Sequence, residues 1–316
     1  MHPSPERAAL DAGASPPRVG LVVDRMDWHA RELATAFAAH GIDTTPIRLP
    51  ACGFATRSAS GMDLDGFGYE LPDAVVVRSM SGGTFEAVTL RLGILHALRE
   101  RGVIVWNDAR AIERCVDKSM TSFLLASAGI ATPPTWATES YEQARSIVQR
   151  EAAAGPLVLK PLFGSQGRGL QLIERPDDLP TQLAGNVYYL QRFVGIERDG
   201  TFHDFRLLVV QDRVIAAMQR HARHWITNVK RGGRPVAVAV NDDMKTLAVR
   251  ACAAVGANFA GVDILYTADE RPCVLEVNSM PAWSGLQKVT SDSIAAVFVE
   301  AFGATLASRA PRGALA

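Results

Sequence analysis

Apolar and polar positions alternate along the chain with two periods, and the change from one period to the other separates strands from helices. From residue 18, "RVGLVVD" predicts a buried strand, "WHARELATAFAAHG" has the spacing of an amphipathic helix, and "IDTTPIRL" predicts a second strand. The same order returns in "DAVVVRS", "FEAVTLRLGILHALRERG" and "VIVWN". Two strand–helix–strand rounds predict a doubly wound α/β domain.

The pattern becomes mixed after this domain. Helices are predicted from Asp108 and from Lys118, and a third at residues 139–155. From "NVYYLQRFV" onward the chain is mainly β, with a hairpin turned at Gln211 and Asp212. We therefore predict a disordered N-terminal extension, the α/β domain and two α+β subdomains, at residues 1–17, 18–110, 111–187 and 188–316.

Composition excludes several classes of protein. The 316 residues include 33 Lys and Arg and 33 Asp and Glu, so no net positive field attracts nucleic acid or an anionic membrane. No segment has the roughly 18 uninterrupted apolar residues of a membrane span, and the N-terminal stretch lacks the apolar core of a signal peptide. The four cysteines are scattered along the chain, which indicates buried thiols in a reducing compartment and not a disulfide framework. We expect a cytoplasmic globular protein without nucleic-acid or membrane partners, which could form a homo-oligomer.

A lysine and three glycines stand together in "GPLVLKPLFGSQGRGLQLI", residues 155–173. "PLVLK" predicts a short strand that ends at Lys160, and Gly164, Gly167 and Gly169 leave backbone N–H groups open to an anion. A fixed cation beside an open backbone indicates phosphate binding. Glycine loops also form simple turns, so this interpretation needs partners elsewhere in the chain.

The strongest partner is "GVDILYTADERPCVLEVN", which predicts two strands joined by a turn at residues 268–271. In this hairpin Asp263 lies opposite Glu276, and Asn278 shares the face of Glu276 because strand side chains alternate. Two carboxylates and an amide are oxygen ligands suited to Mg²⁺. The alternative is a solvated carboxylate face on an edge hairpin.

Other candidate ligands lie between these segments. "DFRLLVV" places Asp204 and Arg206 on one face of a strand. In "TNVKRGG", Arg231 stands beside two glycines, where its guanidinium can reach phosphate oxygens, and Asn228 is a neutral ligand candidate. The alternative for this last segment is a basic surface loop.

A further ligand site is expected at the carboxyl ends of the strands in the α/β domain, where ligands of open sheets collect. Arg78, Ser81 and Gly82 in "VRSMSGG" end one of these strands. Trp283 follows the predicted metal ligands and could line a ligand pocket, although packing is an alternative role for a tryptophan.

Several segments occur in the order and approximate spacing of one family. They are "VDKSMTSFLLASAGIATP", "LVLKPLFGSQGRGLQLI", "LQRFV", "DFRLLVV", "TNVKRGG" and "GVDIL…VLEVNSMPAW". With them the chain resembles the RimK-like branch of the ATP-grasp superfamily over nearly its whole length. The resemblance implies an ATP-grasp fold, α/β and α+β in class, with an N-terminal doubly wound pre-ATP-grasp domain and two subdomains that hold ATP between them.

The resemblance also implies roles for single residues. Lys118 would contact ATP phosphates, and the metal ligands would be Asp263, Glu276 and Asn278. Residues implied to act on the reacting groups are Lys160, Arg206 and Arg231. Residues implied to bind ATP are Lys118, Lys160, Gly164, Ser165, Gly167, Gly169, Gln191, Arg192, Phe193, Val194, Asp204 and Asn228. Two positions depart from many relatives, which carry Glu in place of Arg192 and a basic residue in place of Ile226.

The implied activity is an ATP-dependent carboxylate–amine ligase. A carboxylate attacks the γ-phosphorus of ATP, and an amine then opens the acyl phosphate. The expected cofactors are ATP and one or two Mg²⁺ ions, for which Mn²⁺ may substitute. We expect glutamate or a similar amino acid to be added to a small-molecule carboxylate acceptor, as in relatives that modify pterin cofactors. The candidate residues for binding this acceptor are Arg78, Ser81, Gly82 and Trp283. The alternatives are a ligase for a protein C-terminus or carrier protein, and a non-catalytic ATP-binding module.

Overall fold

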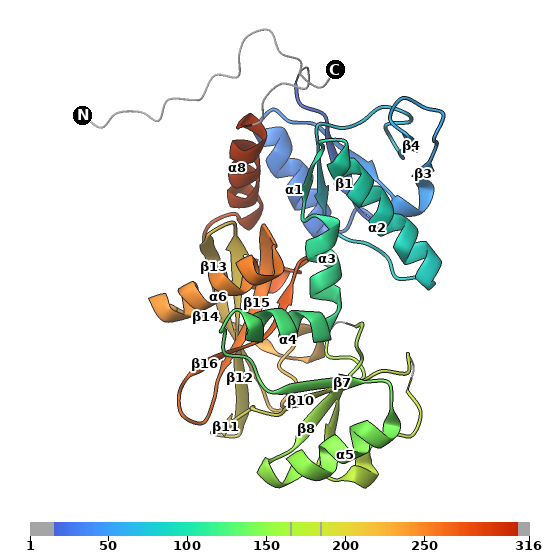
Figure 1. Ribbon diagram of the computed structural model, residues 1–316. Coiled ribbons are helices and arrows are strands. Elements are labelled where there is room, and N and C mark those ends of the chain that lie inside the picture. The colour runs from blue at the N-terminus through green and yellow to red at the C-terminus, as the bar shows by residue number, and fades with distance from the viewer. Residues whose placement is uncertain (1–15, 165, 184, 309–316) are drawn as a thin grey trace, which may run out of the picture.

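The computed structural model describes residues 16–164, 166–183 and 185–308. Most of the predicted extension, residues 1–15, and the predicted ATP ligand Ser165 lie outside the described residues. Three larger sheets organise the described chain, and Figure 1 shows the N-terminal part at the top and the middle part of the chain at the bottom.

The first sheet is parallel and has the strand order β2-β1-β5-β6. Its strands are β1 (Val19–Val22), β2 (Thr44–Ile47), β5 (Ala74–Val77) and β6 (Ile104–Trp106). The two central strands are fully buried, as expected when helices cover both faces of a parallel sheet. This is the doubly wound domain that the sequence predicts.

Two helices cover each face of this sheet. They are α1 (Trp28–Ala39) with α8 (Ile294–Ala307) on one face, and α2 (Phe85–Glu100) with α3 (Ala109–Val116) on the other. Helix α8 packs on α1 through an edge-to-face contact of Phe302 with Phe37 at 5.5 Å between ring centroids. The predicted subdomain 188–316 is therefore wrong at its end, because its last helix completes the core of the first domain.

The middle sheet is antiparallel and has the order β7-β10-β8-β9. Its strands are β7 (Thr135–Thr138), β8 (Leu157–Lys160), β9 (Gln171–Ile173) and β10 (Tyr188–Arg192). Helix α5 (Tyr141–Glu151) packs on one face through Ala144 and Val148. The predicted boundary between residues 187 and 188 falls before β10, so the structure moves it beyond Arg192.

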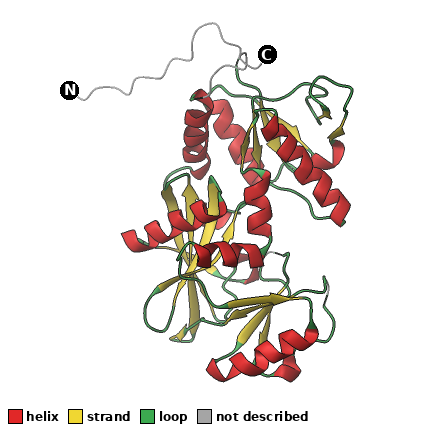
Figure 2. Cartoon of the chain, in the orientation of Figure 1, coloured by secondary structure: helices red, strands yellow, loops and turns green. Residues whose placement is uncertain are grey.

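The large sheet has six strands, with the order β14-β13-β12-β15-β16 and β11 paired to β12. The strands are β11 (Glu197–Arg198), β12 (Thr201–Val210), β13 (Arg213–Ala222), β14 (Arg234–Ala237), β15 (Phe259–Tyr266) and β16 (Pro272–Asn278). Helices α4 (Lys118–Ser127) and α6 (Asp242–Val255) cover one face, and Figure 2 shows these helices outside the strands. The other face packs partly on α1 and α8 and is otherwise free for a site.

A β-bulge at Ile215 shifts the pairing of β13 with β12 by one residue. Asp204 therefore lies opposite Arg220, whereas an unbroken ladder from the turn would set it opposite Gln219. The bulge brings the guanidinium of Arg220 to the face that carries the carboxylate of Asp204.

A second bulge, at Leu275, shifts the pairing of β16 with β15. The turn between these strands holds residues 267–271, one more than predicted, so an unbroken ladder would direct Glu276 to the other face of the sheet. The bulge compensates for the extra residue. The predicted pairing of Asp263 with Glu276 is confirmed, but the predicted turn is one residue too short.

The short elements are β3 (Gly53–Phe54), β4 (Met62–Asp63), α7 (Ser284–Gln287) and the 3-10 helices η1 (Leu49–Ala51), η2 (Ala152–Ala154), η3 (Pro176–Asp178) and η4 (Val229–Arg231). Among the residues that the structure describes, no helix is both long and apolar enough to cross a membrane. All four cysteines carry free thiols.

The side chain of Asn107 joins the first domain to the large sheet. Its amide donates to the backbone carbonyls of Phe259 and Ser279, both at 2.6 Å. Its carbonyl accepts from the backbone N–H groups of Asn258 and Phe259, at 2.7 and 3.0 Å. All four hydrogen-bonding positions of this buried amide are therefore used, and they fix the start of β15 and the end of β16.

Replacement of Asn107 by Ala should lower the free energy of unfolding by about 3 kcal/mol, because it leaves several buried backbone groups without partners. Thermal unfolding of the protein without ligands measures the effect. Asn258→Ala is the matched control, since the side chain of Asn258 has no hydrogen-bond partner in the described part of the chain. Equal melting temperatures for the two variants would contradict the role of Asn107.

Candidate active site

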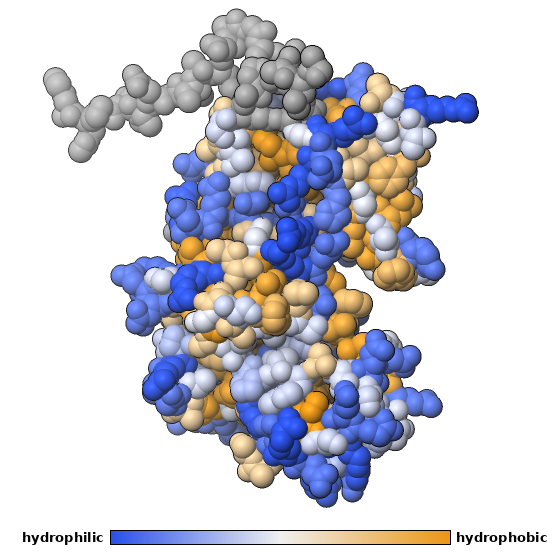
Figure 3. Space-filling model, viewed as in Figure 1, coloured by the Kyte–Doolittle hydropathy of each residue, from blue (hydrophilic) through white to orange (hydrophobic). Residues whose placement is uncertain are grey.

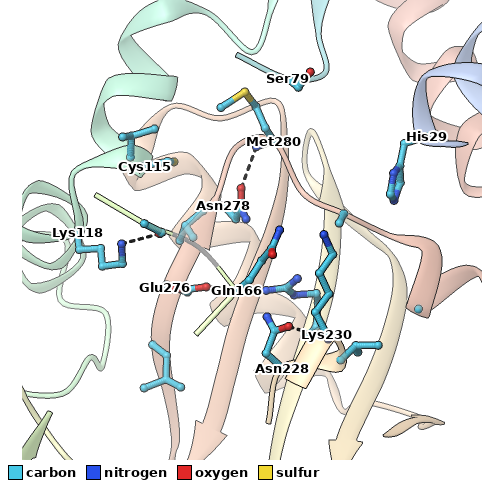
Figure 4. Close-up of a pocket in the computed structure, with 18 of the residues that line it drawn as sticks. His29, Ser79, Cys115, Lys118, Gln166, Asn228, Lys230, Glu276, Asn278 and Met280 are labelled. Atoms are coloured by element: carbon cyan, nitrogen blue, oxygen red, sulfur yellow. Dashed lines mark hydrogen bonds and ion pairs between the residues drawn. The ribbon is translucent and has the colours of Figure 1, made fainter. Parts of the chain in front are cut away.

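A cleft of about 640 Å³ lies where the three sheets meet. The loops after β1 and β5 line one end, α4 and the glycine loop line one side, and β12, β13 and β16 form its floor. Figure 4 shows Lys118 of α4, Gln166 of the glycine loop and Glu276 of β16 around the same space. In Figure 3 the molecule is hollowed between the lobe of the first sheet and the lobe of the middle sheet.

Two lysines face each other across the cleft. Lys160, at the end of β8, donates from Nζ to Oε1 of Gln191 at 2.5 Å. Lys118, at the start of α4, donates from Nζ to the backbone carbonyls of Leu162 and Gly164, at 3.1 and 2.9 Å. Burial lowers the pKa of both ammonium groups, while Glu276 acts in the opposite direction. The structure brings together the two predicted phosphate-binding cations.

The glycine loop needs glycine for two separate reasons. Gly167 and Gly169 have φ angles of +67° and +70°, which side chains other than glycine rarely adopt. A Cβ atom on Gly167 would also lie 2.6 Å from Cγ2 of Ile226. The loop therefore packs closely against Ile226, and this contact is apolar.

Four charged side chains form a buried network on the floor of the cleft. Arg206 donates to both carboxylate oxygens of Asp263, at 2.7 and 2.6 Å. Arg220 donates to both oxygens of Asp204 and also reaches Oδ2 of Asp263 at 2.9 Å. Burial alone would raise the pKa of Asp263, but the two guanidinium groups outweigh it and hold the pKa below its usual value. The predicted residues Asp204 and Arg206 thus bond to other protein groups.

The predicted metal ligands lie side by side at the edge of this network. Glu276 is opposite Asp263 and has a half-exposed carboxylate, with Arg206 at 3.9 Å. Asn278 is two residues further on β16, and its Oδ1 accepts from the backbone N–H of Met280 at 3.1 Å. The N–H groups of Arg206 and Arg220 occupy three of the about four lone-pair positions of Asp263. One position of Asp263, together with Glu276 and Asn278, offers hard oxygen ligands that fit Mg²⁺.

No group of three or more His, Cys, Asp and Glu side chains suited to a metal ion occurs among the described residues. A magnesium site here would have two carboxylates and one amide, and it would take its remaining ligands from water or phosphate.

A narrower hollow of about 130 Å³ continues from the cleft beside the end of β10. Its apolar lining includes Val158, Leu170, Ile226 and Leu275. The predicted hinge residues Gln191, Arg192, Phe193 and Val194 line it as well. Its walls and hinge suit a flat aromatic ring.

Only one of the hinge N–H groups is open to a ligand. The backbone N–H groups of Arg192 and Phe193 donate to Pro134 and Pro156, whereas that of Val194 has no backbone partner in the part of the chain described. The guanidinium of Arg192 points to Glu151, at 3.0 Å. Arg192 can therefore act on a ligand through its backbone and not through its side chain.

The acceptor residues predicted in the first domain have different surroundings. The loops after β1 and β5, neighbouring strands of the sheet, present Asp27, Arg78 and Gly82 to the cleft. Arg78 is buried over the ring of Trp283 at 5.2 Å from its centroid, with Asp27 at 3.8 Å. Ser81 instead donates to Asp24 at 2.6 Å and lines a separate surface hollow.

Trp283 does not line the cleft. It is 1% exposed and packs against Trp28, His29 and Phe259. The prediction that it lines an acceptor pocket is wrong in this respect, because the chain after Asn278 turns into the core between the first domain and the large sheet. The ring of Trp283 packs against the guanidinium of Arg78 and supports it.

Arg231 lies outside the cleft as well. Asn228 and Lys230 line the cleft, and Figure 4 shows both beside Gln166, whereas Arg231 lines another hollow. The reason is that η4 is a single tight turn whose consecutive side chains point in different directions. Arg231 as a catalytic residue stays a prediction, and the geometry favours Lys230 as the cation at this position.

Sequence reasoning missed three residues of the cleft. Arg220 was not predicted because the bulge at Ile215 moves its side chain to the other face of the sheet. Lys230 was not predicted because the order of apolar and polar positions does not reveal the direction of a turn. His29 lines the cleft and accepts through Nε2 from the backbone N–H groups of Trp283 and Ser284, at 3.1 and 3.2 Å. No periodicity predicts this contact, which spans most of the chain.

Comparisons with known proteins agree with this geometry. A family model described as the RimK-like ATP-grasp domain matches residues 115–302. The protein named tetrahydromethanopterin:alpha-L-glutamate ligase of Methanococcus maripaludis is 30% identical over 287 residues, which cover 88% of this chain and 95% of that protein. A probable alpha-L-glutamate ligase of Ectopseudomonas mendocina is 33% identical over 251 residues, or 76% of this chain and 77% of that protein.

Solved structures share the fold. The ATP-grasp ligase PsnB, complexed with minimal precursor, Mg and ADP, superposes with a TM-score of 0.70 at 22% identity, covering 91% of this chain and 97% of that one. The D-cycloserine synthetase DcsG gives a TM-score of 0.65 at 19% identity, covering 91% and 99%. The ATP-grasp fold predicted from the sequence is confirmed.

Asp263→Ala and Glu276→Ala should differ in stability, although the two carboxylates are neighbours. Loss of Asp263 leaves Arg206 and Arg220 buried without a full set of partners and should cost about 3–5 kcal/mol. Loss of the half-exposed Glu276 should change stability by only about 0.5 kcal/mol. Urea unfolding without nucleotide or metal measures both, and equal losses would contradict the buried network.

Proposed function

Because the chain belongs to the RimK-like ATP-grasp family, whose members are ATP-dependent carboxylate–amine ligases, we propose that it adds glutamate or a similar amino acid to a small-molecule acceptor. The observation that carries the proposal is the convergence of Lys118, Lys160, Glu276 and Asn278 on one cleft that also reaches Arg78. Cations for phosphate, oxygen ligands for a divalent ion and a guanidinium for a carboxylate are the parts that such a ligation needs.

ATP would lie with its base in the hollow beside Val194 and its phosphates toward Lys160 and the glycine loop. The apolar walls of that hollow and the open N–H of Val194 support this orientation. Glu276, Asn278 and the remaining lone pair of Asp263 would hold Mg²⁺, which supplies charge neutralisation for the phosphates when bound.

The chemistry needs no nucleophile from the protein. A carboxylate oxygen of the acceptor attacks the γ-phosphorus, and ADP leaves with the electron pair of the broken P–O bond. The amine of the incoming amino acid then attacks the acyl carbon of the acyl phosphate, and phosphate leaves as the amide bond forms. Lys160 and Lys230 would stabilise the charge on the transferred phosphoryl group, and the glycine loop would exclude water.

The acceptor would enter from the first domain. Arg78 lines the cleft and has no close carboxylate partner among the described residues, since Asp27 lies 3.8 Å away, so its guanidinium has capacity for an anion. A cleft of about 640 Å³ is within the usual range for small ligands. Both features favour a compact carboxylate acceptor over a folded carrier protein, and the glutamate ligases named above suggest a pterin-type molecule and glutamate as the pair to try first.

The direct experiment measures ADP release with a panel of acceptors and amino acids, followed by mass spectrometry of the products. A pterin carboxylate with glutamate should release ADP and gain the mass of one or more glutamyl residues. Reaction only with a peptide tail or a carrier protein would contradict the small-molecule acceptor. ATP binding without turnover on any pair would favour the non-catalytic module.

Two variants test which residues act on the phosphoryl group. Lys160→Ala and Glu276→Gln should each lower turnover by about 100-fold or more, because both groups act on charge that develops during transfer. Lys288→Ala, at an exposed lysine outside the cleft lining, is the control that should retain activity. Near-normal turnover of the first two variants, with melting curves like wild type, would overturn the assignment.

A further inference from the structure

A second polar hollow, of about 450 Å³, lies beyond η4 from the reaction cleft. Its lining residues come from the ends of β12, β13 and β14 and from the segment between β13 and β14: Thr201, His221, Ala222, Arg223, His224, Arg231, Gly232 and Arg234. None of them is acidic. We call these residues the basic hollow.

The basic hollow is on the opposite face of the large sheet from the buried network. His203, His221 and Arg234 are direct partners on three adjacent strands, so their side chains share one face. Asp204 and Arg220, each next in sequence to one of these histidines, point to the other face. The hollow is therefore not an extension of the nucleotide site.

The three arginines of the basic hollow lack carboxylate partners. Arg223, Arg231 and Arg234 are exposed, and no ion pair joins any of them to an acidic side chain within the described ranges. The sequence around them, residues 213–241, contains no Asp or Glu. The whole chain is neutral, so this clustering is local and not a result of a basic composition.

The imidazoles complete the hollow with further polar groups. His224 accepts through Nδ1 from the backbone N–H of Ile226 at 3.1 Å, which leaves its Nε2–H free to donate. His221 and His203 stack with ring centroids 4.1 Å apart. Burial lowers the pKa of His221, and His203 and Arg234 add to this effect. The fixed positive charge of the hollow is that of the arginines.

Three like charges held together without counter-charges repel one another, and a ligand with several negative oxygens removes that repulsion. Guanidinium groups bind planar carboxylates and phosphoryl oxygens through paired N–H donors. We propose that the basic hollow is a binding site for a multivalent oxyanion, either a phosphoryl group or a short run of carboxylates.

The anion bound in the basic hollow would be a part of the acceptor that does not react. Lys230 faces the reaction cleft and its neighbour Arg231 faces the basic hollow, so one turn separates the two sites. The turn is closely packed, because a Cβ atom on Gly233 would lie 1.9 Å from the carbonyl oxygen of Thr227. An acceptor that crosses η4 would present one carboxylate to the cleft and a second anion to the hollow. This identification rests on the proposed ligase function, whereas anion binding does not.

Calorimetric titration tests the site directly. Inorganic pyrophosphate and tri-glutamate are titrated separately into the protein at low salt, with Mg²⁺ and ADP present in excess to fill the nucleotide cleft. At least one probe should bind the wild-type protein, and the double variant Arg223→Gln/Arg234→Gln should bind it about tenfold more weakly. Arg213→Gln, at an exposed arginine at the other end of β13, should bind like wild type.

The two probes separate the sources of the anion, since stronger binding of pyrophosphate indicates a phosphoryl group and stronger binding of tri-glutamate indicates clustered carboxylates. Failure of both probes to bind wild type, or equal binding by wild type and the double variant, would overturn the proposal. Both substitutions are at exposed positions, and matching melting curves will show that the fold is intact.

A kinetic comparison then tests whether the anion belongs to the acceptor. With an active acceptor from the panel, the double variant should raise the KM of an acceptor that carries a second anion about tenfold relative to one that lacks it. Equal effects on both acceptors would overturn the identification of the occupant. Anion binding in a protein that ligates no acceptor would leave the site in place and refute only the proposed function.

Discussion

The buried pairing of Asp204 and Asp263 with Arg206 and Arg220 is the interaction on which the arrangement of the site depends. Each carboxylate has a guanidinium bonded to both of its oxygens, and Arg220 joins the two pairs. Burying charges is favourable only when the geometry satisfies nearly all donors and acceptors. The network therefore fixes the relative position of β12, β13 and β15, and this positions Glu276 and Asn278 on the next strand at the edge of the cleft.

The network also gives neighbouring carboxylates different roles. Asp263 is almost fully engaged with arginines, so its main effect is to hold their charge in place, whereas Glu276 is half exposed and free to meet a ligand. Lys160 approaches from the middle sheet and Lys118 holds the backbone of the glycine loop. A rigid floor in the large sheet thus faces a loop that Lys118 holds by two backbone carbonyls and that packs on Ile226 through Gly167.

Strand and helix order could be predicted from the sequence, because the apolar periods are long and the capping residues are clear. The side-chain faces within the large sheet could not, because each bulge adds one residue that the alternation of apolar positions does not reveal. Asp263 and Glu276 were correctly paired through two compensating errors, a turn one residue too short and a missed bulge at Leu275. Arg220 had no such compensation and was missed.

Other features depend on contacts between distant segments. The C-terminal helix α8 packs in the first domain, and Trp283 is buried behind Arg78 instead of lining the cleft, because both complete apolar surfaces that lie more than 200 residues away in sequence. Arg231 lies outside the cleft and Lys230 lines it because of the direction of one short turn. Motif spacing identifies which residues gather near a site, and the direction of each side chain is decided by packing.

The central claim is that the nucleotide binds between the middle sheet and the large sheet, over the buried network. A crystal structure with ADP and Mg²⁺ tests it most directly. The account predicts adenine between Leu170 and Leu275 with a hydrogen bond from the N–H of Val194, phosphates at Lys160, and the metal ion at Glu276 and Asn278. Adenine bound to the first domain, or a metal ion without contact to Glu276, would contradict it.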